Sequence, residues 1–320
     1  MRKILSICII FISLFLLFFA YYFHLNNNYS NTKLKSPLPD FLTIFNNCQV
    51  STTSLWLPSL SNKISSKIKK PDITAKSALV YDLENKIVLY EKNSEKRLPM
   101  ASLTKIMTAI IALENPKKDN KYLVKKEYLV GENSMNLTEG ELLSLEELMY
   151  GLILNSGNDA AETIAGNFKG GRGEFIKAMN DKTKTLGLNN TNFTNPTGLE
   201  GDGNQYTTAY DLLVMTNYAL INFPLFKKIS ATFSYEIDKT FTHKKFYLEN
   251  ETNLLTSYPG VKGVKTGYTY EAGLCLATYL DYNKQKVIGI ILNSENRRDE
   301  MKELLDYSLK SLNIDPPKHS

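Results

Sequence analysis

The order of apolar and polar residues predicts a β-sheet whose strands come from both ends of the chain. Residues 78–82 and 87–90, joined by a Leu-Glu-Asn-Lys turn, are rich in β-forming residues and predict a hairpin. Late in the chain, 274–280 and 287–292 flank a polar turn and predict two adjacent antiparallel strands. We therefore expect one sheet that is built from both ends of the sequence.

Helical spacing dominates the middle and the end of the chain. A capping box at Ser144 and Glu147 indicates where one helix begins. A stripe of apolar residues that starts at Met301 predicts a final helix that packs on the sheet. This order is typical of an α+β fold with helix-sheet-helix layers. Helices are expected at 106–113, 145–153, 159–168, 208–215 and 301–312.

An uncharged apolar run at residues 4–23 is long enough to cross a bilayer, which takes about 20 residues of helix. Arg2 and Lys3 precede it, so the rest of the chain is expected on the extracytoplasmic face of the membrane. A cleaved secretory signal is the alternative. We favour a retained anchor because aromatic residues follow Ala20, where a cleavage site needs small ones.

The stretch that follows is rich in Asn, Ser, Lys and Pro, a composition typical of a tether. We divide the chain into an N-terminal membrane anchor or signal at 1–25, a linker at 26–70 and a catalytic domain at 71–315. Apolar residues at 41–45 and at 55–57, inside the linker, are expected to dock on the domain or on the membrane surface.

Composition and charge exclude some classes of protein. The chain has 320 residues, of which 43% are hydrophobic, as is ordinary for a globular protein. Its net charge of +5 is dispersed among many acids, so nucleic-acid binding is not indicated. The 3 cysteines are too few and too scattered for a disulfide framework, and Cys275 is expected to pack in the core.

Three short motifs carry the candidate chemistry, and the first is Ser102-Leu-Thr-Lys105. The serine and the lysine are three residues apart at the start of a helix, so they share one face. A serine hydroxyl needs a base to become a good nucleophile. Lys105 can be that base where burial and a second cation favour its neutral form. Because most such spacings are solvated helix surface, this motif gains its weight from the other two.

The second motif, Ser156-Gly-Asn158, is a polar turn between two predicted helices. Ser156 could relay a proton to a departing amine, and Asn158 could hydrogen-bond the peptide group of a substrate. Alone, this sequence is also what an ordinary helix-ending turn requires.

The third motif, Lys265-Thr-Gly267, is expected to close a strand that pairs with an extended ligand. Lys265 and Thr266 offer a charge and a hydroxyl to a carboxylate, while Gly267 lets the ligand backbone come close. The amides of Ser102 and Tyr268 would form an oxyanion hole. The three motifs together predict an acyl-transfer site.

A Ser-His-Asp hydrolase is a poor alternative. Of the 3 histidines, only His243 lies inside the predicted domain, in a basic polar run. No G-x-S-x-G turn supplies a matching serine.

The chain resembles the serine D-Ala-D-Ala carboxypeptidases, the low-molecular-weight penicillin-binding proteins of peptidase family S11, over about residues 72–312. Besides the three motifs, the similar segments are Ser156-Gly-Asn-Asp-Ala160, Asn195-Pro-Thr-Gly-Leu199, Tyr206-Thr-Thr-Ala-Tyr-Asp211 and Lys265-Thr-Gly-Tyr-Thr269. The resemblance implies an α+β, β-lactamase/transpeptidase-like penicillin-recognising domain. In it, helices flank a five-stranded antiparallel sheet, and the site lies between the sheet and an all-helical lobe. No cofactor and no metal ion are expected.

The resemblance also implies the role of each site residue. Ser102 is expected to be the acylated nucleophile and Lys105 its base, with Ser156 and Asn158 as the second element. An arginine that assists the substrate carboxylate is expected before the last helix, where Arg297 fits best and Arg298 is the alternative. The other substrate-binding residues implied are Lys265, Thr266, Gly267 and Tyr268.

The implied reaction removes the terminal D-Ala from peptidoglycan stem pentapeptides through an acyl-enzyme, which β-lactam antibiotics would also form. Two other functions compete with this one. A class A β-lactamase would need an E-x-x-L-N segment, and none occurs after Asn158. A non-catalytic module that binds β-lactams or the cell wall would keep the pocket without turnover, but every motif residue is present here.

Many relatives continue into a β-rich second domain and a C-terminal amphipathic helix, whereas this chain ends soon after Leu312. Attachment to the membrane is therefore expected through residues 4–23.

Overall fold

The computed structural model describes residues 17, 21, 55–252 and 254–319. The chain divides into two units, Met1–Ser54 and Leu55–Ser320, and the second holds the predicted domain. Apart from Leu17 and Tyr21, the predicted anchor or signal lies outside the described residues, as does the linker up to residue 54. Among the residues that are described, no helix is long and apolar enough to cross a membrane.

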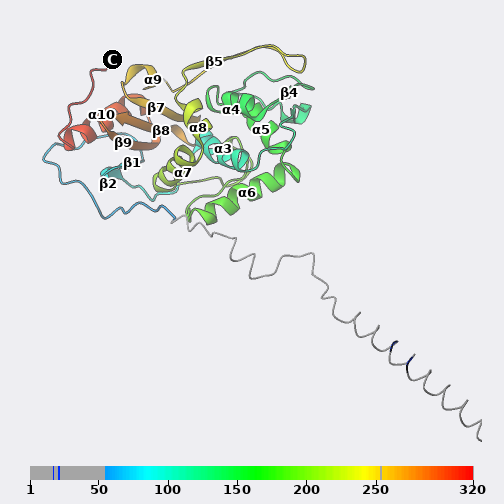
Figure 1. Ribbon diagram of the computed structural model, residues 1–320. Coiled ribbons are helices and arrows are strands. Elements are labelled where there is room, and N and C mark those ends of the chain that lie inside the picture. Colours follow the sequence, from blue (N-terminus) through cyan, green and yellow to red (C-terminus); the bar gives the residue numbers. More distant parts are fainter. Residues whose placement is uncertain (1–16, 18–20, 22–54, 253, 320) are drawn as a thin grey trace, which may run out of the picture. The chain divides into compact units, whose positions relative to one another are not determined.

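An antiparallel sheet of five strands, ordered β2-β1-β9-β8-β7, forms the centre of the second unit (Figure 1). The predicted early hairpin supplies β1 and β2, and the predicted late pair supplies β8 and β9. The first and last parts of the chain meet where β1 pairs with β9, from Ser77 opposite Leu292 to Asp82 opposite Val287. The strands are β1 (Ser77–Asp82), β2 (Ile87–Lys92), β7 (Val261–Thr269), β8 (Gly273–Tyr282) and β9 (Gln285–Ser294).

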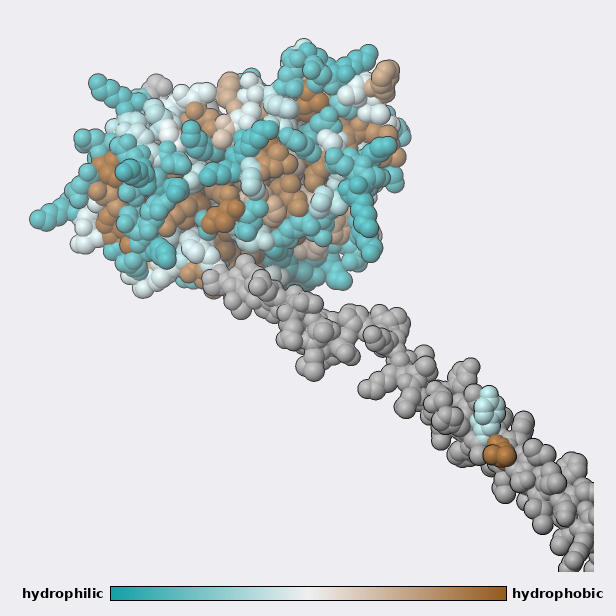
Figure 2. All heavy atoms as spheres, viewed as in Figure 1, coloured by the Kyte–Doolittle hydropathy of each residue, from teal (hydrophilic) through white to brown (hydrophobic). Residues whose placement is uncertain are grey.

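Both faces of this sheet are covered, so every residue of β1 is buried. Leu79 packs into the larger core, against the helical lobe, whereas its neighbour Val80 packs into the core on the other face. There Leu304 and Leu305 of α10 (Arg297–Ser311) cover the strands. The α+β plan of helix-sheet-helix layers is confirmed. The outer face shown in Figure 2 mixes hydrophilic and hydrophobic side chains, as is usual for a globular surface.

The helical lobe is built around α3 (Lys105–Glu114), which is buried from Lys105 to Ala112. A helix that is apolar on nearly all sides is stable only when other elements enclose it. The helices that pack on α3 are α4 (Leu145–Ile153), α5 (Asn158–Gly166), α6 (Gly171–Thr185) and α7 (Ala209–Asn222), and α8 (Pro224–Ser230) packs on α4 and α7. Lys105, the first residue of α3, belongs to the candidate site, so the packing of this buried helix holds Lys105 in place.

The predicted capping box is present at the start of α4. The Ser144 hydroxyl accepts from the Glu147 amide at 3.3 Å, and the Glu147 carboxylate accepts from the Ser144 amide at 2.7 Å. This exchange satisfies two amides that the helix leaves unpaired. It also fixes where α4 begins, and so where the turn at its other end falls.

Some elements were not predicted. Helix α6 was missed because it buries only a narrow stripe of Phe175, Met179 and Thr183 on an otherwise polar surface. Also missed were β3 (Tyr122–Leu123), β4 (Leu142–Leu143), the hairpin of β5 (Ser234–Ile237) and β6 (Phe246–Glu249), and α9 (Leu254–Ser257).

The compact unit of the structure begins at Leu55, ahead of residue 71, where the domain was predicted to start. Trp56 packs edge-on against Tyr81, with ring centroids 5.8 Å apart and planes at 86°. Further along, the Ile64 amide donates to the Val88 carbonyl at 3.0 Å. Trp56 therefore docks on the domain, one of the two alternatives that the sequence left open. Residues 41–45 lie outside the described residues.

Candidate active site

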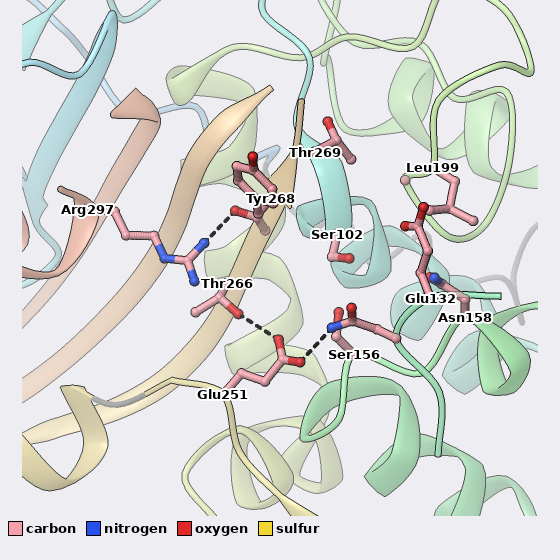
Figure 3. Close-up of a pocket in the computed structure, with 13 residues that line it drawn as sticks. Ser102, Glu132, Ser156, Asn158, Leu199, Glu251, Thr266, Tyr268, Thr269 and Arg297 are labelled. Carbon is pink, nitrogen blue, oxygen red and sulfur yellow. Dashed lines mark hydrogen bonds between the residues drawn. The ribbon is translucent and has the colours of Figure 1, made fainter. Parts of the chain in front are cut away.

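The three motifs and one residue of α10 meet in a single pocket (Figure 3). All of the predicted site residues line it except Lys105 and Lys265, whose side chains are buried beside it. The lining residues are Ser102, Glu132, Asn133, Ser156, Asn158, Gly198, Leu199, Glu251, Thr266, Gly267, Tyr268, Thr269 and Arg297.

Ser102 lies in a 3-10 turn, η1 (Ala101–Thr104), that leads directly into α3. Ala101 is in the left-handed region with φ +49°, and the Thr104 hydroxyl donates to the Ala101 carbonyl at 2.9 Å. Gly198 packs so closely on this carbonyl that a β-carbon on it would lie 2.0 Å from the oxygen. Neighbouring groups on both sides thus fix the backbone that presents Ser102.

Lys105 is fully buried, and its amine nitrogen has three hydrogen-bond partners inside the protein. Its Nζ donates to Ser102 Oγ at 2.9 Å, to Asn158 Oδ1 at 2.7 Å and to the Thr197 carbonyl at 2.7 Å. The last two partners are pure acceptors, so they hold two N–H groups in either protonation state. In a neutral amine, the lone pair is therefore left to point at the Ser102 hydroxyl.

Burial, together with the neighbouring charge of Lys265, lowers the pKa of Lys105 well below its ordinary value. The carboxylates of Glu251, Asp159 and Glu162 act in the opposite direction on that pKa, but they do not reverse it. Desolvation disfavours the charged form of a buried amine, and a second cation adds to the effect. Lys105 can therefore serve as a proton acceptor at a lower pH than an ordinary lysine.

The Ser156-Gly-Asn158 turn joins the end of α4 to the start of α5, as predicted. Ser156 is in the left-handed region with φ +55°, and only 1% of its surface is exposed. Its Oγ has no hydrogen-bond partner within the described part of the chain. A buried hydroxyl in a strained conformation without a partner is typical of a functional position.

Lys265, Thr266 and Gly267 lie on β7, the outermost strand on the side of the sheet that meets η1. A β-carbon on Gly267 would lie 3.1 Å from the Ser102 amide nitrogen, so the strand passes directly over the first turn. Burial lowers the pKa of Lys265 to about 8, with Glu251 raising it and Arg297 lowering it. Tyr268 is 62% exposed at the rim.

Arg297, the first residue of α10, contacts the same strand. Its Nη1 donates to the Gly267 carbonyl at 2.6 Å and, more weakly, to the Cys275 carbonyl at 3.4 Å. Arg298 does not line the pocket. Of the two arginines that the sequence left open, the geometry places Arg297 at the site. Cys275 itself is fully buried, in the core as predicted.

The segment Asn195-Pro-Thr-Gly-Leu199 was noted in the sequence without a role, and it shapes the floor of the site. The Asn195 side chain accepts from the Gly198 amide at 2.7 Å and donates to the Leu199 carbonyl at 2.9 Å. The resulting turn aims the Thr197 carbonyl at Lys105. Asn195 is therefore a positioning residue for the amine.

The loop at residues 132–137, which lines part of the pocket, was not predicted. Asp159 Oδ1 accepts from the Met135 amide at 3.0 Å, and Asp159 Oδ2 accepts from the Leu137 amide at 2.9 Å. The loop contributes Glu132 and Asn133 to the pocket. It contains no motif of its own, and only the aspartate that follows Asn158 hints at it.

Glu251 was also missed, and it is the one lining residue whose carboxylate contacts two sides of the pocket. It accepts from Thr266 Oγ1 at 3.3 Å and from Asn133 Nδ2 at 2.6 Å (Figure 3). Glu251 lies in a polar loop, and its spacing to other residues that could act in catalysis matches no known motif.

His243 takes no part in this site. Its ring is buried, with Nε2 3.2 Å from Glu147 Oε1 and Nδ1 2.8 Å from the Lys244 carbonyl. Its position therefore agrees with the absence of a Ser-His-Asp triad built on Ser102. In the described ranges, no group of three or more His, Cys, Asp or Glu residues could hold a metal ion.

Comparison with known proteins agrees with this geometry. A family model for D-alanyl-D-alanine carboxypeptidase, Peptidase S11, matches residues 64–296. The D-alanyl-D-alanine carboxypeptidase DacF of Bacillus subtilis is 36% identical over 251 residues, which cover 76% of this chain and 64% of that protein. The chain thus spans a little under two thirds of the length of that relative.

Solved structures give the same result for the fold. The Streptomyces K15 DD-transpeptidase is 29% identical with a TM-score of 0.71, covering 76% of this chain and all of that one. Penicillin-binding protein D2 of Listeria monocytogenes, in its ampicillin-bound form, is 29% identical with a TM-score of 0.67, covering 76% of this chain and 100% of that one.

Proposed function

The chain belongs to the D-alanyl-D-alanine carboxypeptidase family, peptidase family S11, and from that premise we propose that it removes the terminal D-Ala from peptidoglycan stem pentapeptides. One observation carries the proposal: the buried amine of Lys105 is fixed by two acceptors with its third direction on Ser102. A lysine held in this way can activate a serine without a histidine.

In the acylation step, neutral Lys105 takes the hydroxyl proton of Ser102 while Oγ attacks the carbonyl carbon of the penultimate D-Ala. The amides of Ser102 and Tyr268 stabilise the resulting oxyanion. As the C–N bond breaks, the leaving amine receives a proton that passes from Lys105 through Ser156. The products are free D-Ala and an ester on Ser102.

In the deacylation step, water attacks the ester carbonyl and gives up a proton to the amine of Lys105. The ester C–O bond breaks, Lys105 passes its proton to Ser102 Oγ, and the tetrapeptide leaves as a carboxylic acid that releases its proton to solvent. Thr266 and Arg297, which line the pocket, hold the terminal carboxylate of the pentapeptide before acylation, with Lys265 buried beside them, because a hydroxyl and two cations match a carboxylate. Asn158 orients the peptide group.

A β-lactam would enter the same steps and stop at the ester. Its ring amide stands in for the scissile peptide bond, and its carboxylate for the terminal one. The ampicillin-bound relative from Listeria monocytogenes supports this extension. We include β-lactam antibiotics among the ligands for this reason.

The direct test is mass spectrometry of a stem pentapeptide incubated with the full chain. The wild type should release one D-Ala per peptide, and labelled penicillin should attach to it covalently. Ser102→Ala should do neither. A well-folded wild type that binds penicillin but leaves the peptide intact would instead indicate the non-catalytic module, and rapid nitrocefin hydrolysis would indicate a β-lactamase.

A second activity has a specific observation in its favour. The similar Streptomyces K15 protein is a DD-transpeptidase, and an amine can replace water as the acceptor of the same acyl-enzyme. The test adds to the pentapeptide assay an acceptor peptide whose N-terminal residue is glycine with a free amino group. Transpeptidation would then give a cross-linked product. With water alone as acceptor, only the tetrapeptide forms.

The place of action belongs to the same proposal. We place the domain on the extracytoplasmic face of the membrane, held by residues 4–23, because peptidoglycan lies there and the apolar run follows two cations. Fractionation of cells that express the full chain, with and without residues 1–25, tests it. A full chain found in the cytosol would contradict it.

A further inference from the structure

Glu251 faces the pocket from the loop between β6 and α9, and the proposed reaction gives it no task. Its carboxylate lies between Thr266 of the strand and Asn133 of the opposite loop (Figure 3). The residue is exposed, so its carboxylate is open to the ligand as well as to solvent. The side chain of Glu251 is negatively charged and lines a pocket that is proposed to bind a negatively charged carboxylate. Its presence there requires an explanation, because two like charges repel.

The contact with Thr266 sets up a conflict over one proton. Thr266 Oγ1 donates to Glu251 Oε2 at 3.3 Å. A threonine hydroxyl has a single O–H group. The proposed function needs that same group to donate to the terminal carboxylate of the substrate, so a ligand carboxylate must displace Glu251 from Thr266.

The charge of Glu251 acts in the same direction as the hydrogen bond. It raises the pKa of Lys265 and opposes the lowering of the Arg297 pKa, which means that it interacts favourably with both cations. Part of the positive charge that would attract a ligand carboxylate is therefore already balanced. The binding of an uncharged ligand end does not depend on this positive charge, so Glu251 does not weaken it.

We propose that Glu251 is a specificity-determining residue, which competes with the terminal carboxylate of the ligand for Thr266 and for the charge of Lys265. This inference rests on the proposed function of the site. The proposal predicts that the site prefers a ligand with a carboxylate over the same ligand without that charge, and that Glu251 makes this preference weaker. The Asn133 contact holds the carboxylate in the competing position.

A purely structural role is the alternative, in which Glu251 only ties the loop at Asn133 to β7. Loss of such a tie would change the site for every ligand alike. The two roles are therefore separated by a ratio of reactivities rather than by activity itself.

The experiment measures second-order acylation rates with benzylpenicillin and with its methyl ester, which lacks the negative charge. Glu251→Gln keeps the shape of the side chain and an oxygen that can accept from Asn133, but it removes the charge. Glu249→Gln is the matched control, since it removes one charge from an exposed residue two positions away that does not line the pocket. Thermal unfolding verifies that each variant is folded.

We expect the ratio of the two rates, acid over ester, to rise about three- to tenfold in Glu251→Gln, since a partly solvated carboxylate at close range has an effect of this order. The ratio should not change in Glu249→Gln. An unchanged ratio in Glu251→Gln, or an equal rise in both variants, overturns the inference while D-Ala release by the wild type still supports the function. A wild type that neither releases D-Ala nor reacts with penicillin overturns both.

Discussion

The amine of Lys105 lies 2.9 Å from the hydroxyl oxygen of Ser102, and the two residues are joined by no more than one turn of backbone. Asn158 and the Thr197 carbonyl hold the other two directions of the amine. The base is therefore oriented before any ligand arrives, which avoids reorganisation during the reaction.

This arrangement predicts that Lys105→Met loses acylation although Ser102 is intact. Methionine fills a similar volume but cannot accept the serine proton, and general-base catalysis of this kind contributes about 10²- to 10⁴-fold. Time-resolved labelling with fluorescent penicillin measures the rate. Labelling at the wild-type rate by the variant would exclude Lys105 as the base.

The pH dependence of acylation should be bell-shaped. The rate rises with pH as Lys105 loses its proton, at a pKa well below its ordinary value. It falls again when Lys265, with a pKa of about 8, loses the charge that binds a carboxylate. Rates with benzylpenicillin across pH 5 to about 10 report both limbs. With the methyl ester the alkaline limb should be weak, and an equally steep fall would contradict the role of Lys265.

Lys265 should also make the protein more stable as pH rises. Its pKa is about 8 in the folded chain and about 10.4 when unfolded, so the unfolded state binds more protons between these values. The free energy of unfolding should gain up to about 3 kcal/mol across this window. Denaturation of Lys265→Met is compared with wild type at each pH, and the difference includes the accompanying change in the Lys105 pKa, which Lys265 lowers. Parallel pH curves would refute it.

Ser156 should be more important for activity than for stability. Its buried Oγ has no partner within the described residues, so Ser156→Ala removes no hydrogen bond from the folded protein. We expect an unchanged or higher melting temperature together with a loss of turnover of about 10²-fold or more, as for other proton relays. A marked drop in melting temperature would mean that the hydroxyl stabilises the fold.

Gly198 and Gly201 offer a matched pair, because their φ angles are +90° and +102° but their neighbours differ. A β-carbon at Gly201 meets nothing within 4 Å, whereas one at Gly198 would meet the Ala101 carbonyl at 2.0 Å. Gly201→Ala should therefore cost only the backbone strain, about 1–2 kcal/mol. Gly198→Ala should lose more stability and also penicillin labelling. Equal effects, measured by chemical denaturation, would argue against the close contact.

The sequence was sufficient for the elements with a strong local signal. The hairpin of β1 and β2, the pair β8 and β9, and the capped start of α4 all follow from patterns that local chemistry enforces. The residues of the three motifs meet at one pocket from different kinds of element. Ser102 lies in the turn before α3, Ser156 lies between α4 and α5, and Lys265-Thr-Gly267 lies within β7.

What could not be predicted depends on contacts between distant segments. Helix α6 buries only three of its side chains, so its place is fixed by the lobe around it. The stretch from Leu55 looks like a tether until Trp56 is seen against Tyr81. Glu251 carries no local signal at all, since only folding brings a lone glutamate to Thr266.

Strand β1 pairs on one side with β2 and on the other with β9, the central strand of the sheet, and this order has a consequence for how the protein folds during synthesis. During synthesis the nucleophile emerges early, whereas β7, β9 and Arg297 follow near the end. Until then the first hairpin lacks its central neighbour, and folding waits for contacts of long sequence separation, which form slowly. In the growing chain Ser102 therefore lacks β7 and Arg297, and the candidate site is complete only once these late segments have been made and folded.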